Sequence, residues 1–416
     1  MYSALRWQQG MTNGEFNSTR KSLRLCGQVP HGDHVLTYRK TDGSAVVISG
    51  LMRCESASAC VVCSARIAKG RGEWLSKVFE QAVERGETIS MLTLTVRHKK
   101  GDDLRTLLQA MEASYRNLQG THAFKQLRSK YNAKFVRVTE VTYGKNGFHP
   151  HFHIAIIHSQ GVNFNLYRSE LTDIWCKWIV NNGLLAPLAK NALNIVENAT
   201  NEQRAWYLTK SNGLSSLEVT NGRYKVAKGE NMSIWGVHSL AVAGDYKSGK
   251  VWRAYEGGIY KKRIFVVSRG MSEEYGVYMK SEGEMSADEF TLSIPEAEGQ
   301  FGSEIADNLQ NVCMTVAFTG AINRETFRRI KKLNLQDEFR EAIRTDCLKE
   351  FLFNFGLQQS YDLQDLLYRH ELKAELRQNM SEAIKKGESQ KFDIANQALE
   401  LGELYVKVQK TLQGSF

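Results

Sequence analysis

The spacing of apolar residues predicts alternating helices and strands between residues 65 and 197. Apolar side chains three and four positions apart are typical of half-buried helices, and strict alternation is typical of strands. The expected helices are 65–85, one that begins after Asp102 or Asp103, and 166–182; the expected strands are 89–96, 135–142, 148–157 and 194–197. Gly70 and Gly72 weaken the first turns of the first helix, and Lys69 and Arg71 are expected on its solvated face.

The strand 148–157 carries an unusual pattern. His149, His151 and His153 fall on one face, and the opposite face is apolar. If the hairpin is symmetric about residues 143–147, Glu140 lies opposite His151. Isolated strand histidines are usually structural, but three imidazoles beside a carboxylate indicate a metal or catalytic site.

The cysteines suggest a second metal site. Cys60 and Cys63 form a C-x-x-C pair, and Cys54 lies six residues before it. This spacing suits a structural tetrahedral Zn²⁺ site with Cys26 as the best fourth ligand. His31 and His34 are reserve ligands, while a redox pair and unliganded thiols remain the alternatives.

Composition narrows the class of protein. The chain has 416 residues, 42% of them hydrophobic and 24% charged, and a net charge of +10, which favours a polyanionic partner such as nucleic acid. We expect no transmembrane helix, because no apolar run reaches the length of about 18 residues that one requires. The N-terminus lacks an apolar signal core and the seven cysteines are odd in number, so we expect a reducing, cytoplasmic location.

A tyrosine after the histidine strand suggests a specific chemistry. Residues 202–211 are predicted to be helical, which places Tyr207 and Lys210 on one face. A tyrosine on a helix is usually a half-buried side chain that only packs against its neighbours. Near a metal site in a basic protein, however, a phenolate can attack a DNA phosphodiester while the lysine neutralises charge.

Together these motifs resemble the plasmid rolling-circle replication initiator proteins, members of the His-hydrophobic-His endonuclease group with a single tyrosine. The resemblance runs from about residue 25 to about residue 270 and is carried by motifs in the family's order. These are Leu92-Thr93-Leu94-Thr95-Val96, Glu140-Val141-Thr142 through His149-Pro150-His151-Phe152-His153, and Tyr207-Leu208-Thr209-Lys210, preceded by the cysteine segment.

The resemblance implies an α+β fold, with an antiparallel sheet of ferredoxin-like or RNA-recognition-like βαββαβ type and helices on one face. His151 and His153 would ligate Mg²⁺ or Mn²⁺, with Glu140 or His149 as a further ligand. Tyr207 would nick one strand at the plasmid origin and remain on the 5′ phosphate. Expected partners are double- and single-stranded origin DNA, a host helicase and host replication proteins; a homodimer is an option, and no membrane contact is expected.

One departure from the family concerns termination. Some relatives carry a glutamate four residues before the tyrosine, where this chain has Gln203. Glu202 points roughly 100° away on an ideal helix. Glu202 on a shifted helix, Glu197, or the tyrosine of a second protomer are the alternatives for that step.

The remaining sequence gives coarser expectations. Residues 213–249 are expected to form a loop, Lys261, Lys262 and Arg263 are DNA-binding candidates, and residues 281–323 lack Lys and Arg. The expected domains are a Cys-rich zinc segment (1–65), a nicking endonuclease domain (66–270), an acidic linker or insert (271–323) and a helical C-terminal region (324–416), in which a winged-helix origin reader is an option.

Three other functions compete. A transposase or conjugative relaxase would use the same chemistry, commonly with paired tyrosines. A zinc-stabilised DNA-binding regulator would have no catalysis. A cupin-like metal enzyme would need a glutamate shortly after the second histidine, and residues 157–161 contain none.

Overall fold

The computed structural model describes residues 18, 20–32, 34–40, 46–199, 231–287, 316–345 and 347–357. The chain divides into two compact units, one of residues 1–269 and 279–358 and one of residues 270–278 and 359–416. The described helix of the second unit is α12 (Met271–Tyr275). Tyr207, Lys210 and Glu202 lie outside the described residues.

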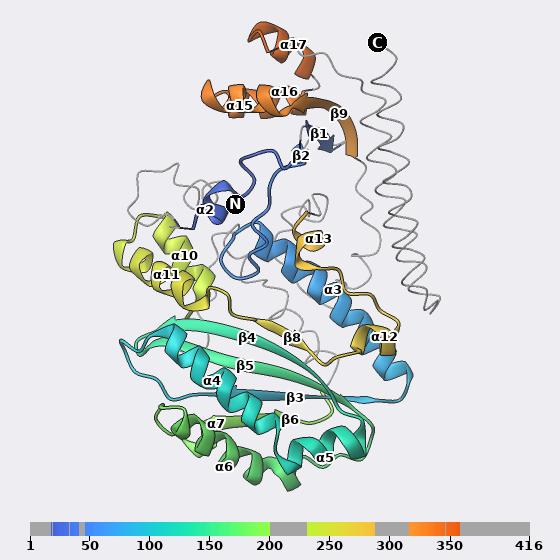
Figure 1. The fold of residues 1–416 in the computed structure, drawn as a ribbon, viewed down its shortest axis with the longest axis vertical. Coiled ribbons are helices and arrows are strands. Elements are labelled where there is room, and N and C mark those ends of the chain that lie inside the picture. Colours follow the sequence, from blue (N-terminus) through green and yellow to red (C-terminus); the bar gives the residue numbers. More distant parts are fainter. Residues whose placement is uncertain are drawn as a thin grey trace, which may run out of the picture. The chain divides into compact units, whose positions relative to one another are not determined.

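A six-stranded sheet and the helices packed on it form one part of the first unit (Figure 1). Its strands are β3 (Thr88–Thr95), β4 (Lys134–Gly144), β5 (Gly147–His158), β6 (Leu193–Val196), β7 (Met232–Ser233) and β8 (Phe265–Val267). They run in the order β6-β3-β5-β4-β7, with β8 also paired to β4, and neighbouring strands are antiparallel. The predicted α+β class is confirmed, and the relation to ferredoxin-like folds stays a prediction.

Three helices cover the apolar face of this sheet. They are α4 (Leu104–Gln119), α5 (His122–Tyr131) and α6 (Asn165–Asn181). The side chains of Asp103 and Thr121 cap the first two by accepting hydrogen bonds from the backbone N–H groups of Thr106 and Phe124. Phe152, Ile154 and Trp175 lie at 0% exposure in the core between sheet and helices, so this face of the sheet is packed against the helices.

The β4–β5 hairpin confirms the predicted register. Glu140 pairs directly with His151, and Lys145 and Asn146 form a turn of two residues. Gly147 follows this turn with φ +87°, a conformation that glycine adopts at little cost. Because cross-strand partners point to the same face, this register places the carboxylate among the imidazoles.

Two residues of helix α3 (Cys63–Glu84) have surroundings that the sequence did not predict. Arg71 is buried and pairs with Glu282 of α13 (Glu282–Ala287), so its expected place on a solvated face is wrong. Gly70 lies against Met285, whose Cγ would be 2.8 Å from an added Cβ atom. The glycine therefore permits close contact between the two helices.

The expected loop over residues 213–249 is wrong where the structure describes it. Residues Ile234–Val242 form α10, and α11 (Tyr246–Ile259) begins before the predicted loop ends. Trp235 and Trp252 are buried together between these helices, with ring centroids 5.2 Å apart. Burial of these rings overrides the glycine- and serine-rich composition that suggested a loop.

A second sheet joins segments that are far apart in the sequence. Strand β1 (His34–Lys40) pairs with both β2 (Val46–Ser49) and β9 (Val316–Asn323). Helices α15 (Arg324–Lys332), α16 (Gln336–Arg344) and α17 (Leu348–Asn354) follow, and their apolar residues form one core with Val35 and Ile322. The short helices α2 (Lys21–Leu25) and α7 (Ala189–Ala192) also belong to the first unit.

Within the ranges that the structure describes, none of the helices combines the length and the apolar character needed to cross a bilayer.

Candidate metal centres

The first candidate centre lies on the histidine face of the β4–β5 hairpin. One ligand atom from each of Glu140, His151 and His153 lies within 4.8 Å of the other two. Alternation along β5 places both imidazoles on this face, and the register of β4 brings the carboxylate beside them.

His153 is held from two sides. Its Nε2 atom lies 2.7 Å from a carboxylate oxygen of Glu140, and its Nδ1 atom lies 3.2 Å from the hydroxyl oxygen of Thr93 on β3. A hydroxyl on the far ring nitrogen is the kind of partner that orients a metal-bound histidine. The ring is buried, whereas the Glu140 side chain is 29% exposed. The group is therefore oriented from within and open toward solvent at the carboxylate.

This donor set suits a divalent cation. Two imidazole nitrogens and a carboxylate oxygen are borderline-to-hard ligands, and a half-exposed site leaves coordination positions for water or a phosphate oxygen. Mn²⁺ should bind at least as well as Mg²⁺, because Mg²⁺ has the stronger preference for an all-oxygen shell.

His149 stands beside this group. Its ring centroid lies 4.0 Å from that of His151 and 4.5 Å from that of His98. The Nδ1 atom of His149 is in close hydrogen-bonding contact with the Nε2 atom of His98. Burial, with a further contribution from His98, lowers the pKa of His149 to about 4. The ring is therefore neutral at pH 7.

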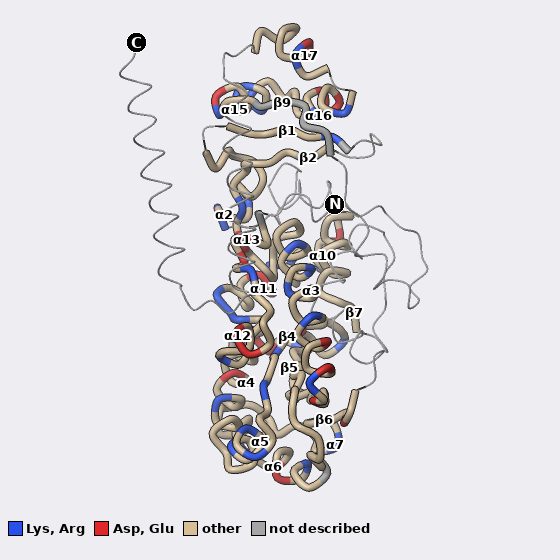
Figure 2. The backbone as a smooth tube through the Cα atoms, turned by 90° about the vertical axis from the view of Figure 1, so that its right-hand side faces the viewer, with Lys and Arg blue, Asp and Glu red and all other residues tan. Residues whose placement is uncertain are grey.

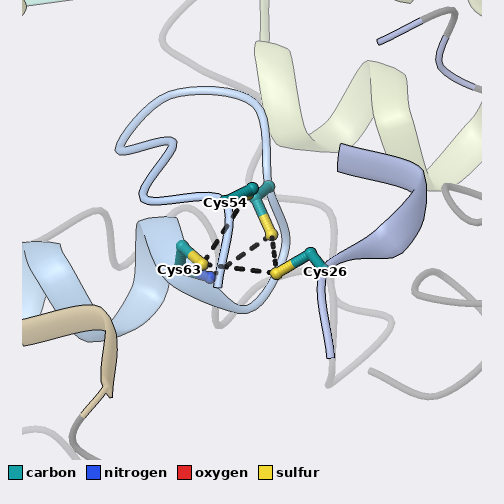
Figure 3. A group of neighbouring side chains, drawn as sticks. Cys26, Cys54 and Cys63 are labelled. Atoms are coloured by element: carbon teal, nitrogen blue, oxygen red, sulfur yellow. Dashed lines mark hydrogen bonds between the residues drawn. The ribbon is translucent and has the colours of Figure 1, made fainter. Parts of the chain in front are cut away.

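The second candidate centre is formed by the four predicted thiols, Cys26, Cys54, Cys60 and Cys63. Figure 3 shows Cys26, Cys54 and Cys63 pointing toward one another. Their sulfur atoms are 3.5 Å apart for Cys26–Cys63 and 3.7 Å apart for Cys54–Cys63, and Cys26 lies 3.6 Å from Cys60. Thiolates at about 2.3 Å from a tetrahedral zinc ion lie about 3.8 Å from one another, so the spacing fits that metal.

The surroundings of the thiols favour the thiolate form at Cys60. Burial raises the pKa of Cys60, but hydrogen bonds with the thiols of Cys26, Cys54 and Cys63 and with the backbone N–H of Cys63 together hold it well below its ordinary value. Cys63 begins α3, whose N-terminal end favours negative charge. Three of the four thiols are fully buried in an apolar core with Trp235 and Trp252, so solvent has little access to the group.

Other predicted site residues have different surroundings. Lys262 forms an ion pair with Glu112, with the ammonium nitrogen 2.7 Å from the carboxylate oxygen. The ammonium of Lys261 lies over the ring of Tyr260, and the backbone carbonyl of Arg263 accepts a hydrogen bond from Arg137. The DNA-binding role of these three residues stays a prediction.

Sequence reasoning did not identify His98 and Thr93 as part of the first centre. Thr93 lies opposite His153 in the β3–β5 pairing, and that register could not be inferred from a local pattern. His98 lies in the loop after β3, where a single histidine gives no periodic signal.

Known proteins match this part of the chain. Residues 47–176 match the family model described as "Replication protein". A segment of 151 residues is 30% identical to "Protein rep" of Streptomyces lividans, covering 30% of this chain and 33% of that protein. Another relative, "Neomycin resistance protein" of Streptomyces cyanogenus, is 26% identical over 151 residues, covering 30% of this chain and 35% of that protein. No solved structure matches the chain.

The predicted resemblance to replication initiator proteins is confirmed. The family match contains the thiols after Cys26, strand β3 and the whole histidine hairpin. The matched segments span about a third of the length of each of these relatives.

Proposed function

We infer that this protein initiates rolling-circle replication of a plasmid by nicking one strand of its origin. The observation that supports this function most directly is the group of Glu140, His151 and His153 in a segment that matches replication proteins. These side chains offer three metal ligands on one face of the sheet. Tyr207, which lies outside the described residues, is the predicted nucleophile.

The reaction follows from the residue types. The phenolate oxygen of Tyr207 attacks the scissile phosphorus, and the bond from phosphorus to the 3′ oxygen breaks. The 5′ phosphate remains on the tyrosine, and the leaving oxygen takes a proton to become a 3′ hydroxyl that primes synthesis. Lys210 neutralises charge on the phosphate. A bound Mg²⁺ or Mn²⁺ supplies polarisation of the non-bridging oxygen when it is held by the imidazoles and the carboxylate.

Release of the tyrosine at the end of a round needs a second nucleophile and a base. Because Gln203 occupies the usual position, we propose that termination does not use the usual same-helix glutamate. Glu202 on a shifted helix, Glu197 and the Tyr207 of a second protomer remain the alternatives.

For the thiol centre we propose a structural zinc ion. Cys26 follows the end of α2, Cys60 lies just before α3 and Cys63 begins that helix, so the ion would join separate segments of the chain. A buried group of four thiolates has no open coordination position, which favours stability over chemistry.

Contact with origin DNA is part of the same proposal. On α15, Arg324, Arg328, Arg329 and Lys332 are exposed, while Phe327 and Ile330 are buried. The blue segments of α15 in Figure 2 mark its Lys and Arg positions. Basic side chains on the exposed face of a helix suit the phosphate backbone. The predicted partners also include single-stranded origin DNA, a host helicase and a second copy of this chain.

The test is incubation of the full chain with supercoiled DNA that carries candidate origins, in Mn²⁺. We expect nicked circles and a covalent 5′ adduct, both lost in Tyr207→Phe and retained in Tyr246→Phe, which alters an exposed tyrosine. If no origin gives an adduct while DNA binding persists, the protein is a non-catalytic regulator. If the adduct forms on DNA ends or transfer sites but not on replication origins, a transposase or relaxase is the better assignment.

A further inference from the structure

The loop that follows β3 is docked onto the tip of the histidine hairpin. A Cβ atom at Gly147 would lie 3.4 Å from both the Lys99 carbonyl oxygen and the Lys100 Cα atom. The loop is closed on itself by hydrogen bonds between Lys99 and Asp102, with donor–acceptor distances of 2.8 and 3.1 Å. These contacts involve none of Glu140, His151 and His153, and the loop presents His98 to the hairpin.

His98 connects the turn to His149. Its Nδ1 atom lies 3.0 Å from the backbone carbonyl oxygen of Asn146, and its Nε2 atom contacts Nδ1 of His149. A carbonyl oxygen can only accept, so the Nδ1 atom of His98 must carry the proton. In a neutral ring Nε2 then has only a lone pair, and the N–H donor in the contact between the two rings must be Nδ1 of His149.

These contacts fix the tautomer and the orientation of His149. The ring of His149 packs against the ring of His151, with centroids 4.0 Å apart. We propose that His98 is a positioning residue of the cation site: it holds His149 in the Nδ1–H tautomer and so keeps the His149 ring against His151, which orients His151 as a ligand. The proposal rests on the metal site of the proposed function.

Partners one step outside a metal site commonly change metal affinity about 10- to 100-fold when they are removed. Loss of the imidazole at position 98 would leave His149 without its orienting acceptor, and His151 would lose its packing neighbour in the ligating rotamer. We therefore expect His98→Phe to weaken Mn²⁺ binding by about tenfold. In His98→Gln the amide oxygen can accept the same hydrogen bond, so we expect affinity within about threefold of the parent protein.

The experiment titrates the full-length protein with Mn²⁺ and measures free Mn²⁺ by electron paramagnetic resonance. The variants are His98→Phe, His98→Gln, His153→Ala and, as a matched control, His122→Phe at the exposed start of α5. Long-range ¹H–¹⁵N spectra of the histidine rings, recorded without metal, report the tautomer of His149. We expect Nδ1–H in the parent and in His98→Gln, and a mixture of tautomers in His98→Phe.

The outcomes separate this inference from the proposed site. Unchanged Mn²⁺ affinity in His98→Phe, or an Nε2–H tautomer of His149 in the parent, would overturn the positioning role. Unchanged affinity in His153→Ala would instead overturn the metal site itself. Circular dichroism of every variant shows whether a lost affinity merely reflects unfolding, and the Gln variant keeps the test valid if the Phe variant does not fold.

Discussion

The two candidate metal centres of this protein differ in ligand type and in burial. The thiol centre has four sulfur ligands, three of them fully buried and enclosed by apolar side chains. The imidazole centre has three ligands of mixed type, and the Glu140 side chain is 29% exposed. A closed centre can only hold the fold together, whereas an open centre can admit a substrate oxygen.

The two centres also differ in the parts of the chain that supply their ligands. The thiols come from separate segments before and at the start of α3, so their geometry exists only when these segments are folded together. The imidazoles come from alternate positions of one strand, and this strand pairs with β4 on one side and β3 on the other along its length.

 We therefore expect loss of metal to lower the stability of the protein at the thiol centre, and to affect only ligand binding at the imidazole centre.

The largest expected effect is the removal of zinc from the thiol centre. A strong thiol-compatible chelator, or the substitution Cys60→Ser, should lower the unfolding temperature by at least about 10 °C, because binding energy at a structural zinc site is also folding energy. Differential scanning calorimetry measures the shift. Cys347→Ser, which alters a cysteine outside the group, is the control and should leave the transition in place. Equal shifts of the unfolding temperature in both variants would contradict the structural role proposed for the four thiols.

The next effect concerns the imidazole centre. His153→Ala should weaken Mn²⁺ binding by about a hundredfold and abolish nicking, since a direct ligand and its contact with Glu140 are both lost. The unfolding temperature should change by only a few degrees, because the ring is a small part of the core. Mn²⁺ titration beside calorimetry on the same sample measures both. A large loss of stability in His153→Ala with intact Mn²⁺ binding would contradict the proposal that this centre binds a cation and contributes little to stability.

Cobalt distinguishes the centres by ligand softness. Co²⁺ added to metal-free protein should give intense sulfur-to-metal charge-transfer absorption and the visible bands of tetrahedral geometry, because thiolates prefer a softer ion. Cys26→Ala should remove most of this absorption, and Glu140→Gln should leave it unchanged. If Glu140→Gln alters the spectrum instead, cobalt occupies the imidazole centre and the assignment of hard and soft sites fails.

A smaller effect is expected where α3 meets α13. Gly70→Ala should destabilise the protein by about 1–3 kcal/mol, because the new methyl group overlaps the side chain of Met285. Gly257→Ala, in α11, is the matched control: nothing lies within 4 Å of its added Cβ atom. Helix propensity should make that control neutral or slightly stabilising. Urea unfolding measures both, and similar signs for the two variants would argue against close packing at Gly70.

Much of the first centre could be predicted from local pattern. The period of two placed three histidines on one face of β5, and the Gly- and Asn-containing link implied the hairpin that sets Glu140 opposite His151. The spacing of the cysteines predicted that their thiols lie together, with Cys26 rather than His31 or His34 as the fourth member of the group. The structure brings these side chains together because each grouping depends on residues close in the sequence or on the fixed geometry of a ligand set.

Other features depended on contacts between distant segments. Arg71 reads as a surface residue until Glu282 is brought to it, and Gly70 reads as a weak helix position until Met285 lies against it. The sequence around α10 has a composition typical of loops, so this helix was not predicted. The pairing of β1 with β9 joins residues almost three hundred positions apart. No local period carries such information.

The sequence by itself determined which side chains share a face: the three histidines of β5, the carboxylate across the turn, and the cysteines that can surround one ion. Only the tertiary structure decided which neighbours those side chains have, including Thr93 behind His153 and His98 beside His149. The reason is physical. Periodicity is a property of the backbone of a single element, whereas a hydrogen-bond partner depends on how separate elements pack.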